Sequence, residues 1–319
     1  MIAYTLRRFL ALAPMMLLMT FLVFLGLELT PGDAVSFIAG PEAMANMDGS
    51  QLAALRESLG LDDPFLARYF RWLGGVLRGD FGYSLTSGVP IARIVAERLP
   101  ATLELSAAAL LVSTLLGSAL GLASALNRGK ALDQALTVAG MIGVSVPEFF
   151  FGLVSILVFS IELKWLPVGG RTRPEYLGLW DRLPHLVLPA LVLGVSMTAG
   201  VMRYARASML DALGKDFMRT ARSKGLPEAR VDLVHGFRAA LAPIAVLIGF
   251  RLPMLIGGSV VIEQIFQWPG VGSEFLAAVR GQNYPLVMTI ALLSVLAVLA
   301  ASFLVDLATA ALDPRVKLS

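Results

Sequence analysis

Long apolar segments alternate with polar stretches along the whole chain. A helix needs about 20 mostly apolar residues to cross the hydrocarbon core of a bilayer. Six segments satisfy this requirement, and they cover about 9–29, 101–125, 135–161, 186–205, 240–262 and 285–311. The pattern predicts an all-α integral membrane protein with six membrane-spanning helices.

The composition supports a membrane protein and excludes several kinds of site. Of the 319 residues, 57% are hydrophobic and 15% are charged, whereas soluble domains average about 45–50% and about 25%. The chain has no cysteine and two histidines, so it lacks disulfides and thiolate metal sites and is unsuited to a histidine-rich metal centre. We expect no metal, no cofactor and no nucleic-acid partner.

The first apolar segment follows Arg7 and Arg8, as the apolar part of a secretion signal would. Its apolar run exceeds the roughly 7–15 residues of such a signal, and the sequence ELTPGD after it is no small-residue cleavage site. We interpret this segment as a retained membrane anchor.

The basic residues between the apolar segments predict the orientation. Cytoplasmic loops carry an excess of Lys and Arg, and long loops are largely exempt from this rule. With both termini inside, the inner segments hold Arg7, Arg8, Arg128, Lys130, Arg203, Arg206, Lys215, Arg219, Arg222, Lys224, Arg230, Arg238, Arg315 and Lys317, and the short outer loops hold only Lys164, Arg171, Arg173, Arg182 and Arg280. We therefore predict cytoplasmic termini.

This topology divides the chain into four parts. Residues 1–29 form the anchor helix, and residues 30–100 form an insertion outside the membrane. Residues 101–311 form the membrane core, which includes a cytoplasmic segment at 206–239, and residues 312–319 form a cytoplasmic tail.

Two amphipathic helices are expected outside the spans. Residues 64–77 place apolar side chains at helical spacing, namely Phe65, Tyr69, Trp72, Leu73 and Val76. Such a helix either lies in the lipid interface, packs over the bundle as a lid, or belongs to a small subdomain with no specific role. A second, shorter helix is expected within 264–285, before Pro285 begins the last span.

Glycine and proline mark positions inside the spans. Gly117 and Gly121 form a G-x-x-x-G pattern, which lets helix backbones approach closely and most often reflects ordinary packing. Pro147, Pro189 and Pro253 lie within or near the ends of spans three to five. Proline in a span leaves a backbone carbonyl that a neighbour or a water-lined cavity must satisfy.

No motif for nucleotide binding or zinc hydrolysis is present. The chain lacks a P-loop, a G-x-G-x-x-G and an H-E-x-x-H pattern. His185 is expected at the outer end of span four and His235 in the cytoplasmic segment, so neither is suited to an intramembrane Ser–His hydrolase. We expect a protein without catalytic residues.

The stretch Asp216–Pro243 is the longest polar run between two apolar segments in the C-terminal half. We expect a helix at about 206–223, a corner near Gly225 and a second helix at about 227–239. Ala221 and Gly225 are expected on one helical face, so that another surface can approach the backbone. The cations of this stretch are Arg219, Arg222, Lys224, Arg230 and Arg238. Taken alone, the pattern also fits a basic loop held by anionic lipid headgroups.

The residues of this corner resemble a known motif. Arg219-Thr220-Ala221-Arg222-Ser223-Lys224-Gly225-Leu226, followed by Leu241-Ala242-Pro243, resembles the coupling motif of ABC-importer permeases in the form of the dipeptide/oligopeptide and nickel family. The generic motif begins Glu-Ala-Ala, so only Ala221 and Gly225 match that form, and the variant is common in the peptide subfamily.

The resemblance extends over nearly the whole chain. Its pieces are Thr30-Pro31-Gly32-Asp33, Leu59-Gly60-Leu61-Asp62, Gly79-Asp80-Phe81-Gly82-Tyr83-Ser84, Trp165-Leu166-Pro167, and Glu263 with Phe266, Trp268-Pro269-Gly270 and Gly272. Each piece is weak by itself, whereas their order and spacing together are specific.

The resemblance implies a division of labour. It implies a type I importer permease in a bacterial inner membrane that forms the pathway with a second homologous permease, which the resemblance suggests is a different chain. It also implies two cytosolic ATPases that bind the ATP and an extracytoplasmic substrate-binding protein. The coupling residues carried over to this chain are Arg219, Thr220, Ala221, Arg222, Lys224, Gly225, Leu226 and Pro227.

Ionisable residues at membrane depth give a hypothesis about the pathway. Glu148 and Arg251 fall near the middle of spans three and five, where a charge costs roughly 2.5–3.5 kcal/mol. They either face the cargo, pair with one another in the empty pathway, or form a purely structural ion pair. We assign the pathway to Ser145, Pro147, Glu148, Arg251 and Glu263.

The cargo and two rival classes remain open at this stage. Di- or oligopeptides are the expected cargo, and nickel chelates, glutathione and oligosaccharides are the alternatives within the same machinery. A stand-alone secondary transporter would need several intramembrane carboxylates and an internal repeat, and neither is visible. A scaffold or receptor would need a soluble signalling domain, which the chain lacks.

Overall fold

The structure is a computed structural model that describes residues 2–29, 35, 47–58, 60–172 and 178–312. This part of the chain consists of helices and loops, with one isolated antiparallel bridge between Tyr83 and Pro90. The predicted all-α class is therefore confirmed. The motif Thr30–Asp33, Leu59 and the tail 313–319 lie outside the described residues.

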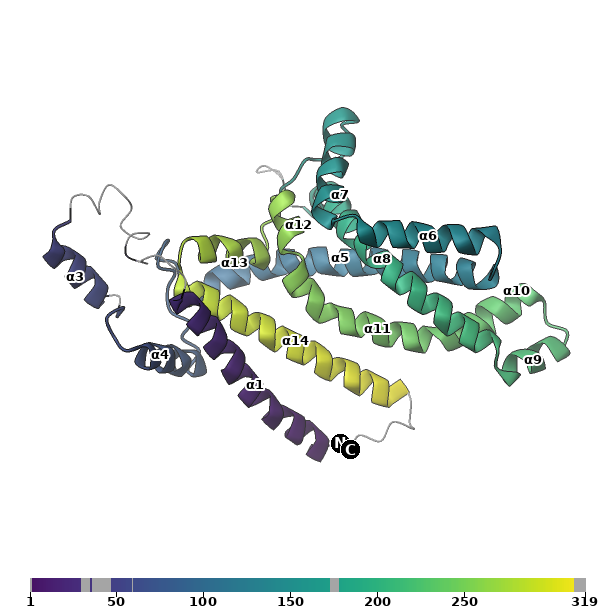
Figure 1. Ribbon diagram of the computed structural model, residues 1–319, viewed down its shortest axis with the longest axis horizontal. Helices are drawn as coiled ribbons and strands as arrows, with labels where there is room; N and C mark the ends of the chain where they lie inside the picture. The colour runs from purple at the N-terminus through teal and green to yellow at the C-terminus, as the bar shows by residue number, and fades with distance from the viewer. Residues whose placement is uncertain (1, 30–34, 36–46, 59, 173–177, 313–319) are drawn as a thin grey trace. The chain divides into compact units, whose positions relative to one another are not determined.

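The chain folds as two compact units (Figure 1). Unit 1 comprises Met1–Pro100 and Gly270–Leu299, and unit 2 comprises Ala101–Pro269 and Ala300–Leu318. The helices of unit 1 are α1 (Ile2–Glu28), α3 (Gly49–Ser58), α4 (Phe65–Leu77), α13 (Val271–Arg280) and the first parts of α5 (Ile91–Leu126) and α14 (Tyr284–Leu312). Those of unit 2 are α6 (Ala131–Ser145), α7 (Glu148–Ser155), the π-helical η1 (Ile156–Glu162), α8 (Leu179–Leu213), α9 (Asp216–Ser223), α10 (Glu228–Arg230), the π-helical η2 (Val231–Gly236), α11 (Phe237–Gly258), α12 (Val260–Ile265) and the remainders of α5 and α14.

Each of the six apolar segments corresponds to a helix or to a bent pair of helices. Among the described residues, Ile91–Leu126, Trp180–Leu213 and Tyr284–Phe303 are long and apolar enough to cross a membrane as single helices. Counting two bent pairs as spans gives five, and α1 contains a shorter apolar helix at Pro14–Gly26. Helices α5 and α8 begin well before the predicted spans, because the polar turns that flank those spans are themselves helical.

The predicted amphipathic helix at 64–77 is present as α4 and packs on α1. Its aromatic stripe contacts the C-terminal half of α1, where the rings of Phe21 and Phe65 lie edge to face with centroids 5.6 Å apart. The Tyr69 ring is almost fully buried, and its hydroxyl lies 3.0 Å from Thr20 Oγ1. Edge-to-face pairs add about 0.5–1.5 kcal/mol to the burial of the rings. This stripe therefore covers the C-terminal half of α1.

The loop after α4 is fixed by one buried amide. Asn283 Nδ2 donates to Ser84 Oγ at 2.7 Å, and its Oδ1 accepts from the Leu85 amide at 3.2 Å. Gly79 and Gly82 adopt positive φ angles of +82° and +73°, a backbone that favours glycine. These contacts hold the Gly79–Ser84 motif against the start of α14.

Helix α8 lies between α6 and α11 in unit 2 (Figure 1). Gly117 and Gly121 on α5 face α8 so closely that a Cβ at Gly121 would lie 2.6 Å from the Met202 carbonyl oxygen. A Cβ at Gly117 would likewise lie 2.5 Å from the Cβ of Val201. The predicted close approach at the G-x-x-x-G pattern is confirmed, and its role here is helix packing.

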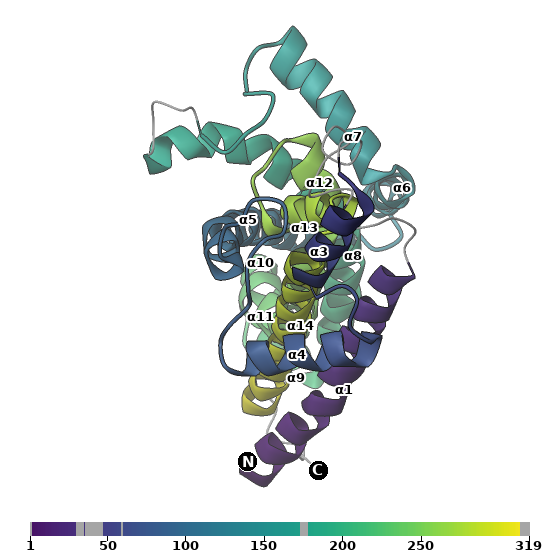
Figure 2. The same ribbon diagram turned by 90° about the vertical axis from the view of Figure 1, so that its left-hand side faces the viewer.

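The prediction of one continuous span at 135–161 is wrong. Helix α6 ends at Ser145, α7 begins at Glu148, and the α6 and α7–η1 segments meet at 95° (Figures 1 and 2). Pro147 explains the break, because it has no N–H for the helix and its ring forces the preceding residue out of the helical region. Val146 accordingly has an extended backbone, with φ −82° and ψ 124°.

Candidate coupling segment and pathway residues

The cytoplasmic segment begins with a break that the sequence did not predict. The expected helix at about 206–223 is two helices, because α8 ends at Leu213 and α9 starts at Asp216. Gly214 follows α8, and Lys215 has an extended backbone with ψ 153°. Glycine is a poor helix former, which explains a stop at this point. Helix α9 is therefore a separate element.

Helix α9 is held in place by a small apolar cluster. Met218 and Ala221, spaced i and i+3, are buried with Val231 of η2, and Leu213 and Leu226 pack against them. Burying a methionine side chain contributes about 1.5–3 kcal/mol. The cluster fixes α9 against the start of the returning helix.

The prediction that Ala221 and Gly225 share one exposed helical face is wrong. Ala221 is only 7% exposed and points into the apolar cluster. Helix α9 ends at Ser223, and Gly225 has a φ of +74° outside the helix. The apolar side of α9 is its inner side, so Ala221 is used for packing within the chain.

A polar face of α9 points outward instead. Asp216, Arg219, Thr220 and Ser223 are exposed and recur at i, i+3, i+4 and i+7. Asp216 and Ser223 were not among the predicted coupling residues, although this spacing is visible in the sequence. Phe217 is also exposed beside this face and is large and apolar.

The side chain of Arg222 is directed toward α10 and η2. Its Nε donates to both carboxylate oxygens of Glu228 at 3.1 Å, and its Nη2 lies 3.7 Å from Asp232. Glu228 and Asp232 belong to α10 and η2, so Arg222 bridges the two sides of the corner. Both pairs are partly exposed, and such pairs contribute only about 0–1 kcal/mol.

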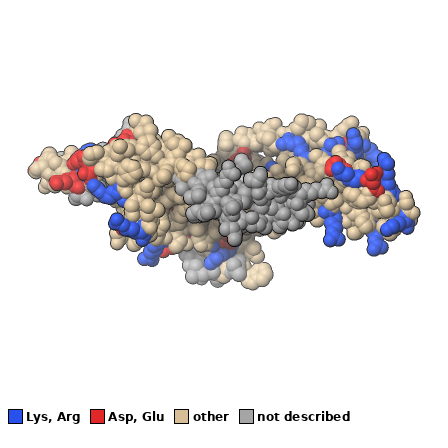
Figure 3. Space-filling model, turned by 90° about the horizontal axis from the view of Figure 1, so that it is seen from below, with Lys and Arg blue, Asp and Glu red and all other residues tan. Residues whose placement is uncertain are grey.

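The corner residues follow in the predicted order. The amide of Gly225 donates to the Arg222 carbonyl at 2.9 Å, which closes α9 with a left-handed glycine. Pro227 stands directly before α10, and Lys224 is exposed. The returning helix runs through η2 into α11 without ending near residue 239. Lys and Arg side chains gather at the end of unit 2 that carries α9 and α10 (Figure 3).

Three of the predicted pathway residues lie at the α6–α7 break. Ser145 and Pro147 are exposed, and the Ser145 hydroxyl donates to the Met141 carbonyl at 2.9 Å. Glu148 lines a hollow of about 320 Å³, and its carboxylate accepts a long bond of 3.4 Å from Ser196 on α8. The other lining residues are Ala139, Ile142, Gly143, Val146, Phe151 and Val195. Among the described residues that line this largely apolar hollow, Glu148 is the one that carries a charge.

Arg251 contacts the same part of α8 without meeting Glu148. Its Nη1 donates to the Met197 carbonyl at 2.8 Å. Within the described ranges, no ion pair joins Arg251 to Glu148. Both side chains are half-buried and bonded to neighbouring positions of α8, so direct neutralisation of one by the other is absent in this conformation.

Glu263 differs from the other pathway residues because its own chain covers it completely. Its side chain is 0% exposed, and its Oε1 accepts from Thr102 Oγ1 at 2.8 Å and from Ser259 Oγ at 3.0 Å. Nearby, Trp268 Nε1 donates to the Ala101 carbonyl at 2.8 Å. In this conformation Glu263 joins α12 to α5 inside unit 2 and does not face a solute.

The structure also contains a carboxylate site that the sequence did not reveal. Asp133 accepts from Arg206 Nε and Nη2, each at 2.8 Å, from Ser124 Oγ at 2.5 Å and from the Gly129 amide at 2.9 Å. These four bonds join the ends of α5, α6 and α8 near the coupling segment. Asp133 and Arg206 lie 73 residues apart, so their pair leaves no local signal, and Arg206 was counted only as a cytoplasmic cation.

Comparison with known proteins agrees with this architecture. The family described as "Binding-protein-dependent transport system inner membrane component" matches residues 117–318, and its N-terminal companion domain matches residues 1–106. The protein is thus a membrane permease subunit of an ABC importer, with the helical fold of the type I class. The chain belongs to the family of binding-protein-dependent transport system inner membrane components.

Two relatives illustrate the range of this family. The oligopeptide transport system permease protein AppB of Bacillus subtilis (strain 168) is 38% identical over 319 residues, covering 99% of this chain and 100% of the relative. The glutathione transport system permease protein GsiC of Salmonella paratyphi A is 37% identical over 317 residues, covering 99% of each chain. The similarity extends over the whole length in both cases.

Proposed function

We propose that this chain forms half of the translocation pathway of an ATP-driven importer of di- and oligopeptides. It lies in a bacterial inner membrane with both termini in the cytoplasm. A second homologous permease, which is a different chain, forms the other half. An extracytoplasmic binding protein delivers the peptide.

Helix α9 and the corner that follows it are the proposed contact with a cytosolic ATPase. The supporting observation is that α9 is a separate helix, fixed to the returning helix by buried Met218, Ala221 and Val231, with an exposed polar face. A helix held this rigidly transmits a push to α8 and α11, as a two-state rigid-body change requires. The chain itself performs no catalysis and binds no cofactor, because its partners bind the ATP.

Peptide cargo is supported by the AppB relative, which is named for oligopeptide transport. Glutathione, itself a tripeptide, is the second candidate because the GsiC relative is named for it. Both cargoes carry an ammonium group, and the single carboxylate of Glu148 in its apolar hollow suits such a group.

Reconstitution of the complete importer in lipid vesicles tests the proposal. The chain is purified with its ATPases and partner permease, and ATP hydrolysis is measured with the binding protein loaded with a dipeptide, a pentapeptide, glutathione or a nickel chelate. We expect peptides to stimulate hydrolysis and to accumulate inside. Failure of any ATPase to purify with the chain contradicts the coupling, and stimulation by the nickel chelate alone contradicts the cargo.

A further inference from the structure

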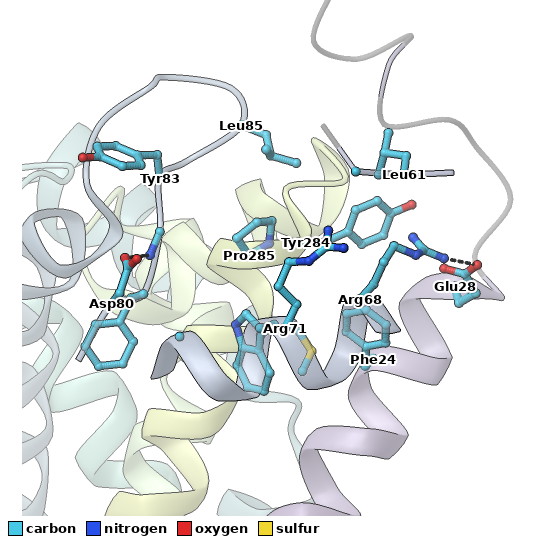
Figure 4. A pocket seen from close by; sticks show the side chains of 16 residues that line it. Phe24, Glu28, Leu61, Arg68, Arg71, Asp80, Tyr83, Leu85, Tyr284 and Pro285 are labelled. Atoms are coloured by element: carbon cyan, nitrogen blue, oxygen red, sulfur yellow. Dashed lines mark hydrogen bonds and ion pairs between the residues drawn. The ribbon is translucent and has the colours of Figure 1, made fainter. Parts of the chain in front are cut away.

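A second hollow lies in unit 1, and neither Glu148 nor any of the predicted coupling residues lines it. Its volume is about 430 Å³, and it lies between the end of α1, one side of α4, the loop after α4 and the first turn of α14 (Figure 4). Pockets of about 300–1,000 Å³ suit small-molecule ligands. With cytoplasmic termini, the end of α1 and the start of α14 face the outside.

The pocket wall carries charges of both signs. Arg68, Arg71, Glu28 and Asp80 all line it. Arg68 Nη2 donates to Glu28 at 2.5 Å, and Arg71 Nη2 donates to Asp63 at 2.5 Å. Figure 4 shows Asp80 and Glu28 on opposite sides, with Arg71 between them. A ligand that matches this wall carries an anionic and a cationic group.

Donors and acceptors in the wall remain available to such a ligand. Arg71 is 62% exposed, and a guanidinium has five N–H donors. Asp80 is exposed, and its Oδ1 accepts from the Gly82 amide at 2.9 Å. Arg68 Nε and Trp72 Nε1 are buried in the wall without a hydrogen-bond partner in the described part of the chain. Buried donors without acceptors are unfavourable, so an oxygen brought by a ligand improves this wall once the side chains adjust.

The rest of the lining is aromatic. Phe24, Trp72, Phe81 and Tyr284 contribute rings to the pocket. Such rings suit an apolar side chain next to the charged groups. The combined chemistry is that of a short peptide with free termini.

We propose that this pocket binds short zwitterionic peptides on the outer side of the membrane, with the carboxylate on Arg71 and the ammonium on Asp80. The site deepens the proposed function and rests on its peptide cargo and its orientation. It gives the permease its own contact with cargo, separate from the hollow at Glu148.

Other ligands fit the wall less well. The exposed apolar residues of α4 are Leu66, Phe70 and Leu77, which recur at i, i+4 and i+11. Their side of the helix is opposite to that of Arg68 and Arg71, so these three side chains do not extend the pocket wall for a lipid chain. A simple inorganic anion is disfavoured because Glu28 and Asp80 offset the two arginines.

The absence of a side chain at Gly60 leaves room for the guanidinium of Arg71. It has a φ of +65°, and a Cβ there would lie 2.9 Å from Arg71 Nη1. Gly60→Ala therefore moves the guanidinium and retains every charge. This variant separates the placement of Arg71 from its charge.

Binding is measured by calorimetry on the complete permease–ATPase complex in nanodiscs, without ATP or binding protein. The probes are alanyl-phenylalanine and its N-acetylated, C-amidated form. We expect saturable binding of the free dipeptide and none of the blocked form. Arg71→Gln and Asp80→Asn are expected to weaken it about tenfold or more, as loss of a charge-assisted bond does, and Gly60→Ala is expected to weaken it in the same direction.

Arg78→Gln is the matched control. Arg78 is an exposed cation at the end of the same helix and does not line the pocket, so we expect unchanged affinity. Each variant must purify with its ATPases, which verifies the fold. Equal affinity in Arg71→Gln, Asp80→Asn and the unsubstituted complex overturns the proposal. The proposal is also overturned if Glu148→Gln is the one variant that loses dipeptide binding. It is likewise overturned if a phospholipid co-purifies with the complex and the dipeptide fails to displace it.

Peptide-stimulated ATP hydrolysis with the loaded binding protein separates this inference from the proposed function. Stimulation without direct dipeptide binding rejects the pocket and retains the importer. Absence of both rejects the peptide cargo and the pocket together. Direct binding of the dipeptide that depends on Arg71 and Asp80 supports the pocket, whether or not the loaded binding protein stimulates ATP hydrolysis.

Discussion

Gly225 and Gly88 have nearly the same backbone conformation, and the space that a side chain would occupy is open at both positions. Their φ angles are +74° and +67°, and a Cβ at either position would meet no atom within 4 Å. Any other residue at such an angle costs roughly 1–2 kcal/mol. The two glycines differ in location. Gly225 follows α9 at the proposed ATPase contact, whereas Gly88 lies in the loop before α5. Open space around Gly225 within its own chain leaves room for a partner.

This difference gives a prediction for Gly225→Trp. The indole would occupy space that the ATPase needs, and a clash in a packed interface costs about 1–3 kcal/mol. We expect the ATPase to bind about tenfold more weakly and uptake to fall accordingly. Gly88→Trp has similar backbone strain and is expected to retain both. Equal behaviour of the two variants in pull-down and uptake assays would falsify the docking of the ATPase at this corner.

At the scale of elements, Asp133 joins three helix ends through four hydrogen bonds. Its side chain is 7% exposed, and that of Arg206 is 30% exposed. Because α8 leads directly to α9, we expect these bonds to make the ends of α5 and α6 move with α8. In the proposed coupling, a push on α9 is therefore expected to reach α5 and α6 as well as α8.

Asp133→Asn removes the negative charge and replaces one carboxylate oxygen, an acceptor, with an NH2 group, which is a donor. Hydrogen bonds to charged groups contribute about 1.5–3 kcal/mol, so we expect a lower melting temperature of the purified complex and fewer peptides transported per ATP hydrolysed. Asp211→Asn is the control, because Asp211 is 71% exposed and pairs with Lys215 at 3.2 Å; such surface pairs contribute about 0–1 kcal/mol. A complex with Asp133→Asn that melts and transports like the control would show that the site has no coupling role.

The elements also show what the sequence can predict. Apolar length located three single helices and two bent pairs that are long and apolar enough to cross a membrane. Helical spacing located α4, and both signals depend on local patterns. The breaks at Pro147 and Gly214 were missed, since glycine and proline occur both inside and between helices of such proteins. The sequence did not show that Ala221 points inward, because the motif identifies this position but not Val231, against which Ala221 packs. The Asp133–Arg206 pair depends on the tertiary fold alone.

At the scale of the whole molecule, the distribution of charge predicts the orientation in the membrane. The inner segments are rich in Lys and Arg, and the chain contains no cysteine. Single cysteines at exposed positions therefore report the side of the membrane without any background. Ser87 in the loop before α5 and Arg128 in the α5–α6 turn are both exposed and are expected on opposite sides.

We expect an impermeant maleimide to label Ser87→Cys in intact cells and Arg128→Cys only after permeabilisation. The positive-inside rule provides the reason, because Arg128 and Lys130 flank a short turn. Growth on peptides verifies that each variant is functional. Labelling of Arg128→Cys from outside would reverse the orientation and would also move the coupling segment away from any cytosolic ATPase.

The right-angle joint at Pro147 has a consequence for the interior of the bilayer. In a regular helix the amide of residue 147 would bond to the carbonyl of Gly143, and proline has no such amide. Gly143 lines the hollow that contains Glu148. A carbonyl without a donor in hydrocarbon costs several kcal/mol, so the kink attracts water or an ammonium group to this depth. Gly143 and Glu148 line the same hollow, so we expect this kink to offer a hydrated site for a positively charged solute within an otherwise apolar span.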